Sequence, residues 1–391
     1  MFDNKQLEYF SQLETPFYYY DIDLFNKSLT ALKLAANKYD YHIHYALKAN
    51  VNDRILELIK EYGFGADCVS GNEVKKAVET GFSLDKIVFA GVGKSDVEIN
   101  YAIDHSIFGF NSESIEEIEI INELAVKKQK IVPVSLRLNP DIDASTHNYL
   151  TTGLNENKFG IPLPFLDDVI LKVASLSNIQ LIGLHFHIGS SITKLEPYVQ
   201  LCERVNSIQN NLHEKHGIEL EHINLGGGLG INYKDPDSEL IPDYNKFFNT
   251  IHKHLKVRQK QQIHFELGRS VVGQSGSLIS RVLYVKRGLN KKFVILDAGM
   301  TDLIRPALYG SHHKIENISK QEAPTLNNIY DVVGPVCETS DSFDNNVKLP
   351  KTERADILAI RSTGAYGEIM VSQYNLRNKP IAVYSDELIS V

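Results

Sequence analysis

The chain contains little cysteine: only three residues out of 391, Cys68, Cys202 and Cys337. An odd and sparse set does not form the disulfide framework that is typical of small secreted proteins. None of the three lies in a CxxC pair, so we predict no thiolate zinc site and no other metal site. This cysteine usage favours a reducing compartment, and we expect the protein to be cytoplasmic.

Long hydrophobic runs and an excess of basic residues are also missing. No apolar stretch approaches the ~20 residues that span a bilayer, and the N-terminal MFDNKQLEYF lacks the basic and apolar regions of a signal peptide. Lys and Arg total 41 against 49 Asp and Glu, a formal net charge of −8, which argues against a general nucleic-acid binder. We therefore expect neither a membrane nor a nucleic acid as a partner.

What the sequence does contain is an alternation of short β-rich runs with amphipathic, helix-like segments. In one such segment, RILELIKEYG (54–63), Ile55, Leu58 and Ile59 fall on one face. The runs with strand character are HIHYALK (42–48), GADCV (65–69), IVFAG (87–91), IFGF (107–110), VPVSLRLN (132–139), LIGLHFH (181–187), HINLG (222–226) and IHFEL (263–267). Eight βα units in series predict a TIM-like (β/α)8 barrel, to which we assign residues 26–270.

After about residue 270 the pattern changes to strand-like runs with turn punctuation and little helix. Examples are VVGQSGSLISRVLYVKRG, FVILDAG, NIYDVVGPVC and ADILAIRSTGAYG. We assign residues 271–391 to an all-β domain. The strand-like FYYYDID near the N-terminus predicts that residues 1–25 join this domain.

Functional residues of such barrels lie at the carboxyl ends of the strands, where this chain places Lys48, His187 and Glu266. A lysine amine there can form an imine with an aldehyde cofactor, a histidine can stack on a flat ring, and a carboxylate can keep a pyridine nitrogen protonated. Taken singly, each has a simpler explanation as a solvated lysine, a core histidine or a surface carboxylate. Only their combination favours chemistry.

A glycine run and a serine offer candidate phosphate contacts. Gly227 and Gly228 follow the seventh strand, where barrels often build a phosphate site from backbone N–H groups. Ser190 lies in a turn after the sixth strand and has a hydroxyl to add. The run matches no nucleotide-binding signature, and a tight turn explains it about as well.

The C-terminal region holds three further motifs, each of which alone is unremarkable loop sequence: DAGMTDLIRPALY (297–309), GPVCETSD (334–341) and GAYGEIMVSQYN (364–375). Arg305 in the first motif can bind a carboxylate in bidentate fashion. Cys337 and Glu338 in the second place a thiol beside a carboxylate. Tyr366 in the third lies between two glycines.

Together, YALKAN, HFHIGS, LGGGLG, FELGR, GPVCE and GAYG resemble the fold-type III pyridoxal-phosphate enzymes, which have an alanine-racemase-like barrel and a C-terminal β domain. Within that group the chain is similar to the diaminopimelate decarboxylases, notably at STHNYLTTGLNENKFGI (145–161) and IRPALYGSHH (304–313). The motifs keep their order over nearly the whole chain. The chain departs from the usual EPGR at Leu267 and from the usual HIGSQ at Ser191, and neither change removes a catalytic group.

The resemblance implies pyridoxal 5'-phosphate as the cofactor and assigns a role to each residue. Lys48 would bind the cofactor covalently, and Cys337 would donate a proton to the substrate. The remaining cofactor contacts would be His187, Ser190, Gly227, Gly228, Glu266, Arg269 and Tyr366. The substrate contacts would be Arg269, Arg305, Tyr309, Glu338 and Tyr366. The resemblance also implies a homodimer whose active site is shared, with Cys337 and Glu338 contributed by the neighbouring subunit.

The implied reaction is decarboxylation of meso-2,6-diaminopimelate to L-lysine and CO2, the last step of lysine biosynthesis. Decarboxylation of ornithine, arginine or carboxynorspermidine is the nearest alternative. Glu338 after the cysteine and the pair Arg269 and Arg305 favour a substrate with a second carboxylate. A racemase is disfavoured because that branch has an arginine at the pyridine nitrogen. A non-catalytic cofactor-binding or regulatory homologue is disfavoured by the β domain and by the presence of both Lys48 and Cys337.

Overall fold

The computed structural model describes residues 2–142, 158–320 and 328–390. Most of the motif at 145–161 therefore lies outside the described residues. The chain divides into two compact units. The barrel unit comprises residues 29–230 and 243–268, and the β unit comprises residues 1–28, 231–242 and 269–391. The stretch 231–242 falls within the range that the sequence assigned to the barrel, yet it groups with the β unit.

The barrel unit is a closed ring of eight parallel strands, as predicted. The strands, in order around the ring, are β2 (His42–Ala46), β3 (Gly65–Cys68), β4 (Ile87–Phe89), β5 (Gly109–Ser112), β6 (Val132–Asn139), β8 (Ile179–His185), β9 (His222–Asn224) and β10 (Gln262–Leu267). Pairing of β10 with β2 closes the ring, and the short β7 (Ile161–Pro162) adds to β6 outside it. All eight strands expected from the sequence are confirmed, with ends that shift by a few residues.

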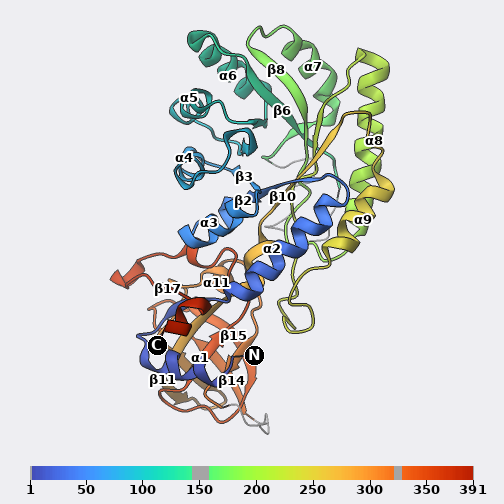
Figure 1. The fold of residues 1–391 in the computed structure, drawn as a ribbon. Coiled ribbons are helices and arrows are strands. Elements are labelled where there is room, and N and C mark those ends of the chain that lie inside the picture. The colour runs from blue at the N-terminus through green and yellow to red at the C-terminus, as the bar shows by residue number, and fades with distance from the viewer. Residues whose placement is uncertain (1, 143–157, 321–327, 391) are drawn as a thin grey trace. The chain divides into compact units, whose positions relative to one another are not determined.

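Helices lie outside this ring of strands (Figure 1). They are α2 (Ile22–Asn37), which begins in the β unit, α3 (Asp53–Glu61), α4 (Gly71–Thr80), α5 (Asp96–His105), α6 (Ile115–Lys128), α7 (Leu166–Ala174), α8 (Glu196–His216) and α9 (Tyr244–His254). In α3, Asn52 caps the first turn by accepting a hydrogen bond from the Arg54 backbone, and Ile55 and Ile59 are fully buried. The amphipathic spacing of the sequence thus directs one face of the helix inward.

The β unit is mostly sheet, also as predicted. Its main strand order is β13 (Ile315–Asn317), β16 (Ile357–Ile360), β11 (Gly276–Arg287), β12 (Lys292–Leu296), β14 (Asn328–Val333) and β15 (Ser342–Leu349). It also contains the short helices α1 (Asn4–Gln12), α10 (Arg269–Val272) and α11 (Arg305–Tyr309). Sequence reasoning missed β13 and β15, since β15 (SFDNNVKL) carries many polar residues.

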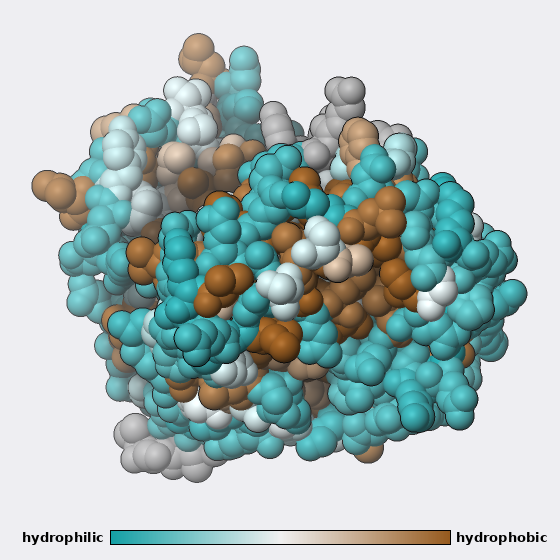
Figure 2. All heavy atoms as spheres, turned by 90° about the horizontal axis from the view of Figure 1, so that it is seen from above, coloured by the Kyte–Doolittle hydropathy of each residue, from teal (hydrophilic) through white to brown (hydrophobic). Residues whose placement is uncertain are grey.

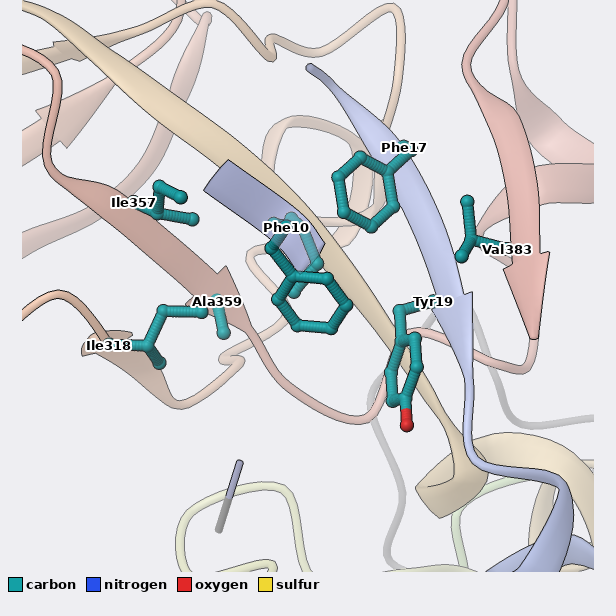
Figure 3. Packing of buried hydrophobic residues seen from close by; sticks show 8 residues of the cluster. Phe10, Phe17, Tyr19, Ile318, Ile357, Ala359 and Val383 are labelled. Carbon is teal, nitrogen blue, oxygen red and sulfur yellow. The ribbon is translucent and has the colours of Figure 1, made fainter. Parts of the chain in front are cut away.

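The N-terminus joins this sheet through β1 (Phe17–Tyr20), which runs antiparallel to β11 and parallel to β17 (Ile381–Tyr384). Phe10 of α1 lies among the labelled side chains of Figure 3, which come from α1, from several strands and from Ile318 directly after β13. Its ring centroid is 5.3 Å from that of Phe17 and 5.0 Å from that of Tyr19. Burial of this apolar cluster attaches the first residues of the chain to its last strands.

Hydrophilic residues cover much of the face in Figure 2, and hydrophobic residues gather toward its middle. In the described ranges, no helix has both the length and the apolar character needed to cross a membrane.

Candidate active site

Lys48 stands directly after β2, in the single helical turn Leu47–Ala49. Its Nζ lies 3.3 Å from Oδ2 of Asp67, a fully buried residue of β3 that sequence reasoning did not single out. Burial raises the pKa of Asp67 to about 6; the charge of Glu266 adds to this rise and the charge of Lys48 opposes it. The sequence feature that could have pointed to Asp67 is its position near the end of a predicted barrel strand.

Glu266, near the end of β10, is almost completely buried and is surrounded by hydrogen-bond donors. Its Oε1 accepts from the side-chain amides of Asn111 (2.8 Å) and Asn224 (2.7 Å). Its Oε2 accepts from Nε2 of His185 at 2.8 Å. These donors come from strands β5, β9 and β8, so four strand ends build this one carboxylate site.

The surroundings of Glu266 favour its ionised form. Burial alone would raise its pKa, but the charge and hydrogen bond of His185, followed by the charge of Lys48, outweigh burial and hold the pKa well below its usual range. A permanently ionised carboxylate is the group that keeps a basic ring nitrogen protonated. Two buried atoms close by, Oδ1 of Asp67 and Nδ1 of His185, have no hydrogen-bond partner among the described residues. This donor and acceptor set fits a pyridoxal ring.

His187 lies two residues beyond β8 and is half-buried. Its pKa falls well below the usual value, first because of burial and then because of the charges of Lys48 and Arg137. The backbone N–H of Gly227 donates to His187 Nδ1 at 3.3 Å, so the ring proton of the neutral imidazole is on Nε2. A neutral, flat imidazole is suited to stacking on another ring.

The glycine run after β9 passes too close to its neighbours for any side chain. A Cβ on Gly226 would overlap the carbonyl oxygen of Phe186, and one on Gly227 would overlap the carbonyl oxygen of Glu266. Gly226 and Gly228 have φ angles of +68° and +99°, which disfavour other residues. The turn is therefore compact enough for a ligand to approach its backbone closely, and Ser190 is half-buried in the preceding loop.

The β unit holds the predicted substrate-binding arginines. Arg269 and Arg305 are both buried, and both donate to the phenol oxygen of Tyr233, at 2.6 Å and 2.9 Å respectively. The Arg269 guanidinium also lies 4.6 Å from the ring centroid of Tyr366. The structure therefore brings together three residues singled out from the sequence, and adds Tyr233, which had no signal beyond following the glycine run.

Arg305 has further neutral partners in Ser311 (3.4 Å) and His313 (3.2 Å). His313 Nδ1 donates to the carbonyl of Arg361 at 2.9 Å, so its Nε2 is free to accept from Arg305. Burial, and then the charge of Arg305, lower the pKa of His313 to about 3. No carboxylate of the described residues forms an ion pair with Arg305. Tyr309 ends the same short helix and is half-buried.

Cys337 and Glu338 are both exposed, on the loop between β14 and β15. The backbone N–H of Cys337 donates to Asn375 at 3.3 Å, and Glu338 accepts from the hydroxyl of Tyr374 at 2.7 Å. Buried Asp341 shapes the loop by accepting from backbone N–H groups that include that of Val336, at 2.6 Å. The thiol and the carboxylate therefore lie on a loop that these hydrogen bonds hold in place, and both are accessible.

A second cluster lies at the other end of the barrel, where four histidines line a cavity of about 660 Å³. His44 donates to the carbonyl of Lys86 and accepts from His264, which in turn lies 3.0 Å from His222. Burial lowers the pKa of all four, His42 included, and that of His44 falls to about 4. In the parts of the chain that the structure covers, no three His, Cys, Asp or Glu side chains are placed to hold a metal ion.

Comparison with known proteins identifies the family to which this architecture belongs. The family model described as pyridoxal-dependent decarboxylase, pyridoxal binding domain, matches residues 24–273. Diaminopimelate decarboxylase of Bacteroides thetaiotaomicron is 54% identical over 98% of both chains, and that of Neisseria meningitidis serogroup B is 41% identical over 95% of this chain and 88% of its own.

Solved structures give the same result. Diaminopimelate decarboxylase from Helicobacter pylori complexed with L-lysine superposes with a TM-score of 0.90 at 40% identity, over 97% of this chain and 94% of that one. A lysine/ornithine decarboxylase from Vibrio vulnificus has a TM-score of 0.83 at 20% identity, which shows a shared fold. The chain therefore belongs to the diaminopimelate decarboxylase family of pyridoxal-dependent decarboxylases.

Proposed function

We propose that this chain decarboxylates meso-2,6-diaminopimelate to L-lysine and CO2, with pyridoxal 5'-phosphate as its cofactor. The observation that carries the proposal is the buried carboxylate of Glu266, which three strand-end donors hold in place. Bound pyridoxal phosphate supplies a conjugated ring that accepts the electron pair left on the α carbon when CO2 departs. A carboxylate at the ring nitrogen strengthens that capacity, whereas an arginine there would weaken it.

The barrel residues divide the task of holding the cofactor. Lys48 binds it covalently through its amine, and Glu266 keeps a proton on the ring nitrogen. His187 packs its neutral ring against the cofactor ring. The Gly228 backbone N–H, the Ser190 hydroxyl, Arg269 and Tyr366 bind at or near the phosphate, and Gly227, whose N–H donates to His187, keeps the backbone of this turn close to it. A phosphate is well suited to the glycine turn, because backbone N–H groups approach it there without steric hindrance.

The residues of the β unit bind the substrate. Arg305, with Arg269 and Tyr309, binds carboxylate, since a buried guanidinium with neutral partners has an unbalanced charge to offer. Tyr366 also contacts substrate. Glu338 binds the amino group at the far end of the substrate. A diamino dicarboxylic acid satisfies both requirements, whereas ornithine and arginine each lack a second carboxylate.

We further propose that the enzyme is a homodimer and that Cys337 and Glu338 act at the neighbouring subunit's Lys48. Their exposure on a loop is consistent with this role, and Cys337 is then the donor of the proton that the α carbon receives after CO2 leaves. Mixing inactive Lys48→Ala and Cys337→Ala chains tests the arrangement. Equal amounts should regain about a quarter of wild-type activity, because half of the dimers then contain one intact site. Failure to regain activity contradicts a shared site.

The substrate is tested by offering purified protein with pyridoxal phosphate four compounds: meso-diaminopimelate, L-ornithine, L-arginine and carboxynorspermidine. We expect CO2 release from meso-diaminopimelate, with L-lysine as the product. Release only from one of the others would overturn the substrate and the roles of Arg305 and Glu338. Lys48→Ala should abolish turnover and the visible absorbance of the bound cofactor, and near-normal activity of that variant would refute the mechanism. We place the reaction in the cytoplasm, which the free cysteines support.

A further inference from the structure

Tyr233 occupies a central position among the buried cations of the β unit. Its phenol oxygen is the shared acceptor of Arg269 and Arg305, and the Arg305 guanidinium lies 4.9 Å from its ring centroid. Its ring also makes an edge contact with His313, at 5.1 Å between centroids. The side chain of Tyr233 therefore contacts Arg269, Arg305 and His313.

The two guanidiniums repel each other, and Tyr233 reduces that repulsion. Burial favours its neutral phenol, but the charges of Arg269 and Arg305 outweigh burial and hold the pKa of Tyr233 below its usual value. The same mutual repulsion lowers the pKa of Arg305, where burial is the larger cause. An oxygen between two guanidiniums fixes the direction in which their remaining N–H groups point.

The backbone that carries Tyr233 is itself anchored to the β unit. Asp237, four residues further on, forms ion pairs with Lys314 (2.5 Å) and Arg361 (3.3 Å). Gln274 donates to the carbonyl of Glu239 at 3.3 Å. These contacts hold the segment 231–242 against Lys314, which directly precedes β13, Arg361, which directly follows β16, and Gln274, in the turn before β11, so the phenol oxygen has a fixed position relative to the arginines.

We propose that Tyr233 is a positioning residue that sets substrate specificity. It holds Arg269 and Arg305 at the spacing and orientation needed to bind one carboxylate of the substrate, the one that is not lost as CO2. This proposal rests on the proposed function. Decarboxylation removes one carboxylate of diaminopimelate, and the other persists in the product L-lysine. Tyr233 therefore acts on affinity for substrate and product alike, and it takes no part in breaking the C–C bond.

Tyr233→Phe tests the proposal, since it keeps the ring over Arg305 and removes only the shared acceptor. We expect KM for meso-diaminopimelate and the inhibition constant of L-lysine to rise together by about tenfold, because a hydrogen bond to a charged group has been lost from each arginine. kcat should change less than about threefold. Inhibition by cadaverine, which has no carboxylate, should stay within about twofold, whereas a general structural defect would alter all three ligands.

Tyr284→Phe is the matched control, because Tyr284 is also a β-unit tyrosine beneath an arginine, with Arg354 5.1 Å from its ring centroid, but it is exposed. It should behave as wild type. If wild-type protein neither binds nor decarboxylates diaminopimelate, the proposed function fails and the role of Tyr233 fails with it. If wild type is active and Tyr233→Phe has the same KM and the same L-lysine inhibition, the role of Tyr233 alone is overturned.

Discussion

In the barrel, the buried carboxylate of Glu266 is surrounded by donors that the chain itself provides, two amides and a histidine. In the β unit, the buried guanidinium of Arg305 is bound by a phenol, an imidazole and a hydroxyl, and no carboxylate of the described residues pairs with it. The barrel therefore stabilises its charge before any ligand arrives. The β unit leaves a positive charge for the ligand to balance.

This difference matches the two tasks. A group that must hold a proton on a cofactor atom throughout turnover benefits from fixed surroundings, because preorganised groups need no rearrangement as the reaction proceeds. A group that must attract a substrate benefits from an unbalanced charge, since the substrate carboxylate then gains the full interaction. A buried unbalanced charge destabilises the folded chain. Arg305 in the β unit should therefore lower the free energy of unfolding while raising affinity for the substrate, whereas Glu266 in the barrel should not have this cost.

The largest effect is expected from Glu266→Gln, which removes the charge and keeps the shape. Three donors remain aimed at the site, and the ring nitrogen loses the partner of its proton. We expect kcat to fall by on the order of 10²- to 10³-fold with a smaller change in KM. Steady-state kinetics measure both, and a kcat within threefold of wild type would exclude the role given to Glu266.

Asp167→Asn is the control for that experiment. Asp167 is also hydrogen-bonded to a histidine, His216 at 2.8 Å, but at the surface of the barrel unit. Loss of this carboxylate should leave kcat unchanged. A similar loss of kcat in both variants would point to a general effect of removing barrel carboxylates.

The next prediction concerns two arginines of the β unit, whose replacement should affect substrate affinity and the free energy of unfolding differently. Arg305→Met should raise KM for meso-diaminopimelate by about 100-fold while leaving the free energy of unfolding unchanged or higher by about 1 kcal/mol, since a buried cation with neutral partners is removed. Arg361, which pairs with Glu316 (2.8 Å) and Asp237, is the matched case.

Arg361→Met should instead lower the free energy of unfolding by about 1 to 3 kcal/mol, because Glu316 and Asp237 each lose one of their two cationic partners and keep only Lys314. Urea denaturation compares the two variants with wild type. Equal destabilisation by both substitutions would mean that Arg305 is balanced within the chain, and the contrast between the two units would then be wrong.

The smallest expected effect is the pH dependence of the free energy of unfolding, to which both units should contribute in the same direction. The pKa values of His44 and His313 are lowered by burial to about 4 and about 3, so the unfolded chain takes up their protons first. The free energy of unfolding should therefore fall as pH drops below about 6.5, by about 1.4 kcal/mol per pH unit for each histidine, and His44 should finish titrating near pH 4.

His44→Gln should flatten that dependence by about 1.4 kcal/mol per pH unit between pH 6 and pH 5. Urea denaturation at several pH values measures the slope. His254→Gln, at an exposed histidine that ends α9, should leave the slope as it is. An unchanged slope in His44→Gln would show that His44 is not held neutral in the folded chain.

Although it did not predict the short helix α11 that carries Arg305, the sequence by itself determined the eight barrel strands, the sheet-rich C-terminal region and the strand ends at which Lys48, His187 and Glu266 lie. It did so because local periodicity fixes each strand and because parallel strands of a barrel present their carboxyl ends together. The role of each of these residues came from motif resemblance and remains a prediction until it is measured.

Only the tertiary structure decided which side chains meet. Asp67 beside Lys48 depends on the register between two consecutive strands, and the amides of Asn111 and Asn224 on Glu266 depend on strands further apart in the chain, neither of which a local pattern contains. Tyr233 follows the barrel's glycine run in sequence, yet it joins Arg269 and Arg305 in the β unit. Local spacing places a residue at the end of a strand, but long-range packing decides its hydrogen-bond partners and therefore its charge.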